Sequence, residues 1–181
     1  MDTRLSEPGP GAHFGSMLGK RQELMATARA FGTTMSRAGM SLVYGGGAIR
    51  RMGELARAVL AAGGHVTGIS PEFLVKKERM LDGVNELIVT RSMHERKHLM
   101  FEKSTGFVAL PGGIGTLEEL AEITTWAQLN QHAKPGIIED VADYWPHLVK
   151  LLDPMSAEAF IRAAQEVFLR WAPTIDDFIP L

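Results

Sequence analysis

Three glycines stand within residues 112–115, between an apolar run that ends at Pro111 and a segment of helical periodicity. A glycine loop that opens a helix presents free N–H groups and the positive end of the helix dipole, which together bind phosphate. Each charge-assisted hydrogen bond contributes on the order of 1.5–3 kcal/mol, so a few would anchor a monophosphate. The alternative is a tight turn without a ligand, although a plain turn seldom needs glycine at three of four positions.

Two carboxylates, Glu118 and Glu119, follow this loop in what we expect to be the first helical turn. Thr116 and Glu119 have the spacing of a capping box, in which a hydroxyl and a carboxylate satisfy the first free amides. On this pattern alone, capping is the simpler interpretation of Glu119, and chemistry is the alternative. Glu118 complements the helix dipole.

A second group of polar residues, His94, Arg96 and Lys97, begins a helix predicted over 92–104. Arginine and lysine together favour a phosphate or carboxylate clamp, and a solvated basic face explains them equally well. We interpret His94 as a structural hydrogen-bonding residue. Because no His, Asp and Glu residues have metal-ligand spacing, we expect no metal site.

The glycine clusters do not match two common nucleotide motifs. A dinucleotide fingerprint needs glycine at its first, third and sixth places. Counted from Gly113 the sixth place is Glu118, and counted from Gly45 it is Arg50. A P-loop needs Gly-Lys-Ser/Thr after its spacer, and the sequence has none. These mismatches argue against NAD-type and P-loop sites.

Short apolar strands and longer helical segments alternate along the whole chain, which predicts an α/β fold with a doubly wound parallel sheet and helices on both faces. Ligands of such sheets bind beyond the carboxyl ends of the strands, where both glycine clusters fall. We expect strands at 40–44, 65–70, 86–90, 106–111 and 135–140, and helices at 18–38, 52–62, 92–104, 116–129, 143–153 and 156–169.

Composition is that of one ordinary globular domain: 181 residues, 45% hydrophobic, 22% charged and a net charge of −2. This net charge gives no indication of a basic surface that would bind nucleic acid or an acidic membrane. The sequence has no cysteine, which fits a cytoplasmic protein, and no apolar run approaches the roughly 18 residues of a membrane span. Residues 1–14 hold a Pro-Gly-Pro-Gly run and are expected to be a flexible segment.

Two linked motifs resemble a known family. "PGGIGTLEE" at 111–119 and "MHERK" at 93–97 are similar to the paired signatures of the Lonely Guy family of cytokinin riboside 5′-monophosphate phosphoribohydrolases, often mislabelled as lysine decarboxylases. The likeness extends from about Gly15 to Ile161. It implies a Rossmann-like domain over 15–181 that binds a nucleoside monophosphate, forms a homodimer and needs no cofactor.

The resemblance also implies an activity, hydrolysis of the N-glycosidic bond of N6-modified adenosine monophosphates to free base and ribose 5-phosphate; many relatives accept plain AMP. It makes Arg96 and Glu119 the catalytic pair, so capping and catalysis would be successive uses of one carboxylate. Arg96 would position Glu119 or the ribose hydroxyls and keep Glu119 ionised. The positions implied to bind substrate are Glu78, Lys97, Gly112, Gly113, Ile114, Gly115, Thr116, Leu117, Glu118 and Thr125.

Two departures from the family pattern bear on activity. The family opens with a strand, but residues 7–14 are a poor strand, so the first strand of the sheet is expected to be degenerate. Arg50 and Arg51 also stand where the family has glycine and leucine. A positive φ at Arg50 would cost about 1 kcal/mol or more, or the arginines could add phosphate contacts. The alternative function is therefore a non-catalytic nucleotide or molybdenum-cofactor carrier of the same fold.

The predicted helix at 116–129 also suggests how subunits could associate. Trp126 and Leu129 lie beside polar residues on it, and family members pair through this region. Burial of these side chains within one subunit is the alternative.

Overall fold

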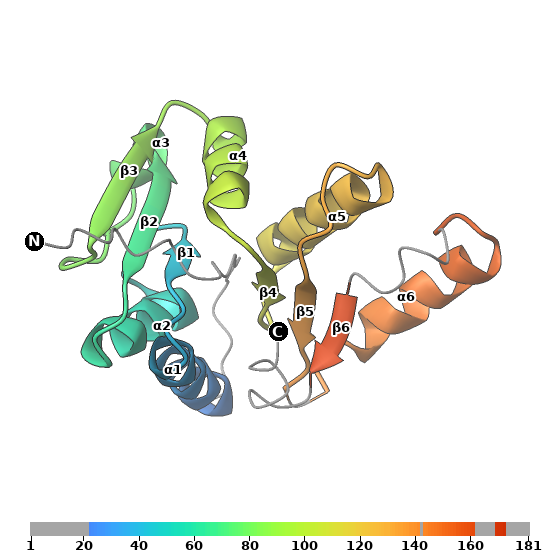
Figure 1. Cartoon of the computed structure of the whole chain (residues 1–181), viewed down its shortest axis with the longest axis horizontal. Coiled ribbons are helices and arrows are strands. Elements are labelled where there is room, and N and C mark those ends of the chain that lie inside the picture. The colour runs from blue at the N-terminus through green and yellow to red at the C-terminus, as the bar shows by residue number, and fades with distance from the viewer. Residues whose placement is uncertain (1–21, 142, 162–168, 173–181) are drawn as a thin grey trace, which may run out of the picture.

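The computed structural model describes residues 22–141, 143–161 and 169–172, in which strands and helices alternate (Figure 1). Within these ranges no helix is both long enough and apolar enough to cross a membrane. The helices are α1 (Gln22–Arg37), α2 (Arg50–Ala61), α3 (Glu72–Val75), α4 (Met93–Lys103), α5 (Ile114–Gln128) and α6 (Pro146–Ala157). The strands are β1 (Leu42–Tyr44), β2 (Val66–Pro71), β3 (Glu86–Thr90), β4 (Phe107–Ala109), β5 (Gly136–Glu139) and β6 (Leu169–Ala172).

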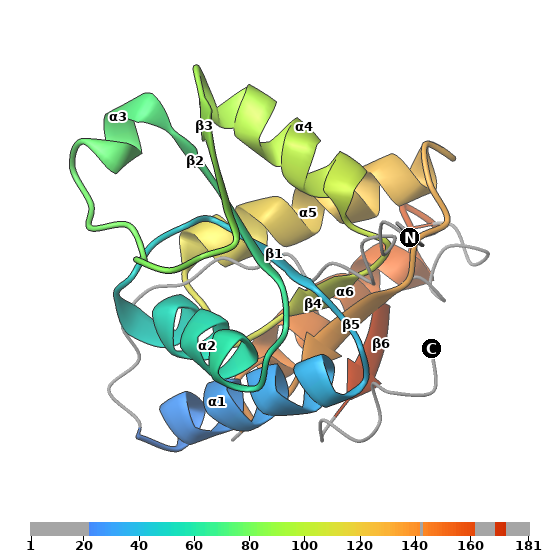
Figure 2. The same cartoon turned by 60° about the vertical axis from the view of Figure 1, so that its left-hand side comes forward.

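All strand pairs are parallel, which confirms the predicted α/β class. The strands form two three-stranded sheets with the orders β1-β2-β3 and β4-β5-β6. Helices α1 and α2 cover one face, and α4 and α5 lie on the other (Figure 2).

Alternation along the strands explains the two covered faces, because successive side chains of a strand point to opposite sides. Leu42 and Tyr44 of β1 pack into the core beneath α1 and α2, whereas Val43 packs with Met100 of α4. In β5, Ile137 belongs to the same core as Leu42 and Tyr44. The next residue along β5 points to the other side and belongs to a separate buried cluster under α5. Both of these strands therefore contribute to both layers.

The described strands form two sheets, with β1 at one edge of the first and β4 at one edge of the second. Among the described residues no backbone ladder joins these two strands. Residues 1–21, which include the segment 1–14 expected to be flexible and the expected degenerate first strand, lie outside the described part. The apolar core is nevertheless continuous, since Tyr44 of one half and Val108 of the other belong to the same buried cluster.

A buried arginine of α2 contacts elements of both halves. The Arg51 side chain is 2% exposed, and its Nε donates a hydrogen bond to the Leu24 carbonyl oxygen of α1 at 3.1 Å. Its guanidinium also donates to the Pro111 carbonyl oxygen after β4 and lies 3.9 Å from Glu139 Oε2 at the end of β5. Arg50 begins α2 and does not have a positive φ, so the backbone strain considered for it does not arise.

The C-terminal part differs from the prediction. The helix expected over 156–169 does not form in its described part, because α6 ends at Ala157 and Ala159 adopts a φ of 58°. The Phe160 N–H then donates to the Met155 carbonyl oxygen at 2.8 Å, a helix-terminating arrangement. Residues 169–172 form the strand β6, which the sequence pattern did not indicate.

The pair formed by Arg51 and Glu139 makes stability depend on pH. Burial raises the pKa of Glu139 from 4.5 to about 7, and the nearby Arg51 opposes this only in part. Between these values the folded state holds a proton that the unfolded chain has released, so stability falls as pH rises from about 4.5 to about 7. We expect the wild type to lose about 3 kcal/mol of unfolding free energy relative to Glu139→Gln across this range.

Urea denaturation of both proteins at pH 5 and pH 8 measures this difference. The glutamine variant is the matched control because it keeps the shape of the side chain and removes the titration. Parallel stability profiles of the two proteins between pH 5 and pH 8 would contradict the prediction.

Candidate functional site

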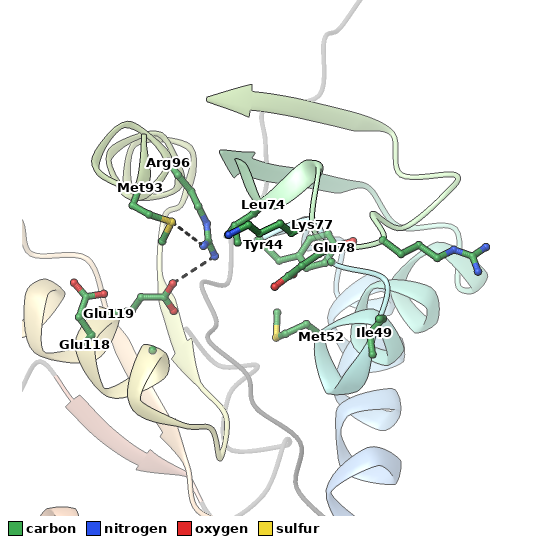
Figure 3. Close-up of a pocket in the computed structure, with 14 residues that line it drawn as sticks. Tyr44, Ile49, Met52, Leu74, Lys77, Glu78, Met93, Arg96, Glu118 and Glu119 are labelled. Carbon is green, nitrogen blue, oxygen red and sulfur yellow. Dashed lines mark hydrogen bonds and ion pairs between the residues drawn. The ribbon is translucent and has the colours of Figure 1, made fainter. Parts of the chain in front are cut away.

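A cavity of about 350 Å³ opens where β1 and β2 end and where α4 and α5 begin. This place matches the carboxyl-end position that the sequence pattern predicts for a ligand. Figure 3 shows side chains from the turn after β1, from α3 and the segment after it, and from both helices turned toward one another. The lining residues are Tyr44, Gly45, Gly47, Ile49, Met52, Leu74, Lys77, Glu78, Arg79, Met93, Arg96, Gly115, Glu118 and Glu119.

Arg96 and Glu119 face each other in this cavity (Figure 3). Arg96 Nη2 lies 3.6 Å from Glu119 Oε1, and the two side chains are only 11% and 8% exposed. A Cβ built on Gly45 would lie 2.5 Å from Arg96 Nη2, so a larger residue there would displace the guanidinium from its present position beside Glu119. The structure thus brings the predicted catalytic pair together within one cavity.

The start of α4 explains how Arg96 is oriented. Ser92 is the N-cap, and its hydroxyl accepts a hydrogen bond from the Glu95 N–H at 3.1 Å. The Glu95 carboxylate accepts in turn from the Arg91 N–H at 2.8 Å. This reciprocal capping sets the first turn of α4, from which Arg96 projects into the cavity.

The capping box expected at Thr116 and Glu119 is wrong. Helix α5 begins at Ile114, and Gly113 takes the N-cap position in extended conformation without any side-chain cap. Glu119 therefore lies in the second turn of α5 and faces the cavity. Among the described residues Thr116 Oγ1 has no hydrogen-bond partner, although Thr116 is only 2% exposed. Gly113, rather than Thr116, is therefore the N-cap of α5.

The turn after β1 forms another wall of the cavity. Gly46 has a φ of 79°, which favours glycine, and its carbonyl oxygen accepts from the Leu81 N–H at 2.9 Å. The Ala48 N–H donates to the Arg79 carbonyl oxygen at 2.9 Å. These bonds hold the segment that carries Glu78 against the turn, so Glu78 lies in the cavity with Arg96 and Glu119.

Lys97 connects α4 to α5. Its Nζ donates to Glu118 Oε1 at 2.5 Å and to Glu122 Oε1 at 3.0 Å, and the side chain is 14% exposed. Burial lowers the pKa of Lys97, but the two carboxylates outweigh burial and the net change is upward. A solvated basic face does not describe α4, since Arg96 and Lys97 are both largely covered.

The remaining predicted positions fall into two groups, one at the cavity and the loop that leads to it and one in a separate groove. Gly115 lines the cavity, and the loop from Gly112 to Ile114 leads to it, with the Ile114 side chain 75% exposed. Leu117 and Thr125 line an apolar groove between α5 and α6 instead. Sequence reasoning missed several apolar and basic residues of the cavity wall, whose only signal was nearness to the glycine turn or to α4: Tyr44, Ile49, Met52, Leu74, Lys77, Arg79 and Met93.

Solved structures with this fold include carriers of a cofactor. A molybdenum cofactor carrier protein from Chlamydomonas reinhardtii matches 95% of this chain and 94% of its own with a TM-score of 0.71. A molybdenum cofactor binding protein from Rippkaea orientalis matches 97% and 95% with a TM-score of 0.69. The sequence identities are 20% and 23%, so these likenesses show the Rossmann-like fold alone.

Sequence comparisons are more specific. A family model described as "possible lysine decarboxylase" matches residues 52–180. A probable cytokinin riboside 5′-monophosphate phosphoribohydrolase of Oryza sativa subsp. japonica is 39% identical over 165 residues, which are 91% of this chain and 67% of that protein. A cytokinin riboside 5′-monophosphate phosphoribohydrolase of Arabidopsis thaliana is 40% identical over 91% of this chain and 72% of its own. The chain therefore belongs to the Lonely Guy family, to which its paired motifs pointed.

Proposed function

We propose that the protein hydrolyses the N-glycosidic bond of N6-modified adenosine 5′-monophosphates to free base and ribose 5-phosphate. The observation that carries this proposal is the pairing of Arg96 with Glu119 inside a cavity at the carboxyl ends of the strands. Relatives about 40% identical are named for this activity. Residues 15–181 would form the one domain that carries it, and the lack of cysteine fits action in the cytoplasm.

Cleavage of a nucleotide's glycosidic bond develops positive charge on the ribose, as in the hydrolysis of sugars. The Glu119 carboxylate stabilises that charge and accepts a proton from the attacking water, whose oxygen bonds to the anomeric carbon. The bond from that carbon to the base breaks, the base nitrogen takes up a proton from solvent, and Glu119 afterwards releases its proton to solvent. Arg96 holds the carboxylate in place and favours its ionised form.

The phosphate of the substrate would bind at the loop from Gly112 to Thr116 and the start of α5. This loop presents backbone N–H groups at the positive end of the helix dipole. The Thr116 hydroxyl adds a buried polar group without a partner among the described residues. Anchoring the phosphate there would place the sugar near Glu119, which lies on the next turn of the same helix.

Two other functions have less support. The fold shared with molybdenum cofactor carriers leaves a non-catalytic carrier as the alternative, but a carrier gives no reason for a largely buried carboxylate and guanidinium facing one cavity. A lysine decarboxylase that uses a Schiff base needs a neutral lysine. The two carboxylates on Lys97 raise its pKa and oppose that state.

Glu119→Gln is expected to lower the release of base from isopentenyladenosine monophosphate or AMP by about 10²–10⁴-fold, because the amide accepts no proton. Arg96→Ala is expected to act in the same direction. Product chromatography measures both, and circular dichroism checks folding. Glu102→Gln is the control, since this exposed carboxylate of α4 pairs with His98 and lies outside the cavity. Wild-type turnover by both cavity variants would refute the mechanism.

The nucleoside is expected to be a much poorer substrate than its monophosphate. Two lost charge-assisted hydrogen bonds of about 1.5 kcal/mol each correspond to a reduction in kcat/KM of about 100-fold. A comparison of adenosine with AMP under the same conditions measures this ratio. Equal values of kcat/KM for the two compounds would contradict the binding of the phosphate by the glycine loop.

We also propose that the protein is a homodimer that pairs through α5 and α6. The Trp126 ring packs edge-on against Phe101 of the same subunit at 4.9 Å, a contact that fits the alternative of burial within one subunit. Leu129 is 62% exposed, and on α6 Leu151 is 54% exposed. Leu151 also lines the apolar groove between the two helices, and Phe160 beside it is 77% exposed. An apolar surface of this kind favours a protein partner.

Light scattering is expected to give a mass twice that of the monomer for the wild type. Leu151→Lys with Met155→Lys is expected to give the monomer, because a charge in the groove opposes its burial. Both side chains are exposed in one subunit, so folding should be retained. Lys150→Leu, which adds no charge on the same helix, is the control. A monomeric wild type would contradict the proposal.

A further inference from the structure

Two side chains donate hydrogen bonds to consecutive carbonyl groups of the glycine loop. The Arg51 guanidinium donates to the Pro111 carbonyl oxygen. The Tyr144 hydroxyl donates to the Gly112 carbonyl oxygen at 2.5 Å. The two donors come from different parts of the chain, Arg51 from α2 and Tyr144 from the segment between β5 and α6.

These contacts determine where the loop's N–H groups point. The described residues contain no cis peptide bond, and in a planar trans peptide the C=O and the following N–H point in opposite directions. When Arg51 holds the Pro111 carbonyl, the Gly112 N–H must point away from Arg51. When Tyr144 holds the Gly112 carbonyl, the Gly113 N–H must likewise point away from Tyr144.

Without such contacts the loop would be free to adopt other orientations. Glycine occupies more of φ/ψ space than any other residue, so the peptide planes at Gly112 and Gly113 have low intrinsic preference for one direction. A phosphate site needs the N–H groups turned toward the ligand before it arrives, because ordering them on binding costs affinity. Donors on the carbonyl side meet this need without touching the phosphate.

Arg51 is itself rigidly placed. Its Nε donates to the Leu24 carbonyl oxygen at 3.1 Å, and Glu139 Oε2 lies 3.9 Å from its Nη2. Burial lowers the pKa of Arg51 from its ordinary value, yet that value is so high that the guanidinium stays charged and keeps all its donors. A leucine here, as the family pattern has, could make none of these contacts.

Tyr144 has its own support. Its ring packs edge-on against Trp145 at 5.1 Å, and Trp145 is 6% exposed in the cluster beneath α5. The Trp145 N–H donates to Asp140 Oδ1 at 3.1 Å, which fixes the segment just after β5. The Tyr144 side chain remains 42% exposed, so its hydroxyl can be removed without opening the core.

We propose that Arg51 and Tyr144 are positioning residues that orient the Gly112 and Gly113 N–H groups for the phosphate of the substrate. Neither residue touches the reacting atoms, and both act through the loop's carbonyl groups. The inference deepens the proposed function and rests on it. It gives Arg51 a role in binding, although its side chain lies behind the loop and makes no contact with the ligand.

Tyr144→Phe tests the proposal with the smallest change. We expect the Kd for ribose 5-phosphate and the KM for AMP to rise about tenfold, while kcat and the Kd for adenine stay within twofold of wild type. Calorimetry gives the Kd values, and the release of base gives the kinetic constants. Thr33→Val is the matched control, because it removes a hydroxyl that donates to the Arg29 carbonyl oxygen on α1, far from the loop in the sequence.

The variant Arg51→Lys provides a second, independent test of the proposal. Lysine keeps the charge beside Glu139 but lacks the forked guanidinium that donates to both carbonyl groups. We therefore expect the Kd for ribose 5-phosphate to rise about tenfold in this variant too, while the Kd for adenine stays within twofold of wild type. Arg29→Lys, a surface arginine paired with Glu54, is the control for that exchange. If Arg51→Lys unfolds, Tyr144→Phe alone decides.

The outcomes separate this inference from the proposed reaction. Unchanged binding of ribose 5-phosphate by Tyr144→Phe would overturn the positioning role, as would an equal loss of adenine binding. A wild type that binds ribose 5-phosphate and releases no base would refute the hydrolysis, and the binding comparison would still decide the role of the two residues. A wild type that binds neither AMP nor ribose 5-phosphate would overturn both.

Discussion

The relative position of the two halves of the sheet is the constraint on which the site depends. Arg96 belongs to α4, which packs on β1, β2 and β3, whereas Glu119 belongs to α5, which follows β4. The described residues include no ladder between β1 and β4. Among the described residues, the shared apolar core, Arg51 and the bonds of Lys97 to α5 join the two halves and so support the 3.6 Å separation of the two side chains.

Arg51 performs this role at a cost in stability. Burial raises the pKa of Glu139 to about 7 and lowers that of Arg51, so for both groups desolvation exceeds their mutual attraction. Arg51 Nη2 lies 3.9 Å from Glu139 Oε2, and neither Glu139 oxygen has a hydrogen-bond partner among the described residues. A buried pair of this kind is weak evidence for stability and better evidence for a geometric requirement. Its contact with the loop carbonyl supplies that requirement.

The elements that follow local rules could be predicted from the sequence. Residues 86–90 are an apolar, β-rich run with polar boundaries, and β3 has those bounds. The start of α5 could not be placed, because the Thr-x-x-Glu spacing resembles a cap while Gly113 takes that position without a side chain. The sequence did not indicate the strand β6, because these four residues begin at the end of a segment, 156–169, whose pattern favours a helix.

The site shows the same division between local and distant determinants. The pairing of Arg96 with Glu119 could be expected because each follows a strand of one parallel sheet and because the motifs resemble a family. The network of Arg51 could not, since its partners Leu24 and Pro111 lie 27 and 60 residues away in the sequence. Such contacts depend on how helices pack across the sheet, which no short spacing encodes.

The fold itself does not decide function, because a molybdenum cofactor carrier with 20% identity shares the architecture over nearly the whole chain. The decision lies in a few side chains around a common backbone site. A glycine loop at the start of a helix binds an anion in either case. A carboxylate one turn further on that helix, held by an arginine from the other half of the sheet, adds the means to stabilise positive charge on a sugar. Since that geometry requires the two halves to keep one relative position, the Arg51 contact would serve it in this chain even where the contact lowers stability.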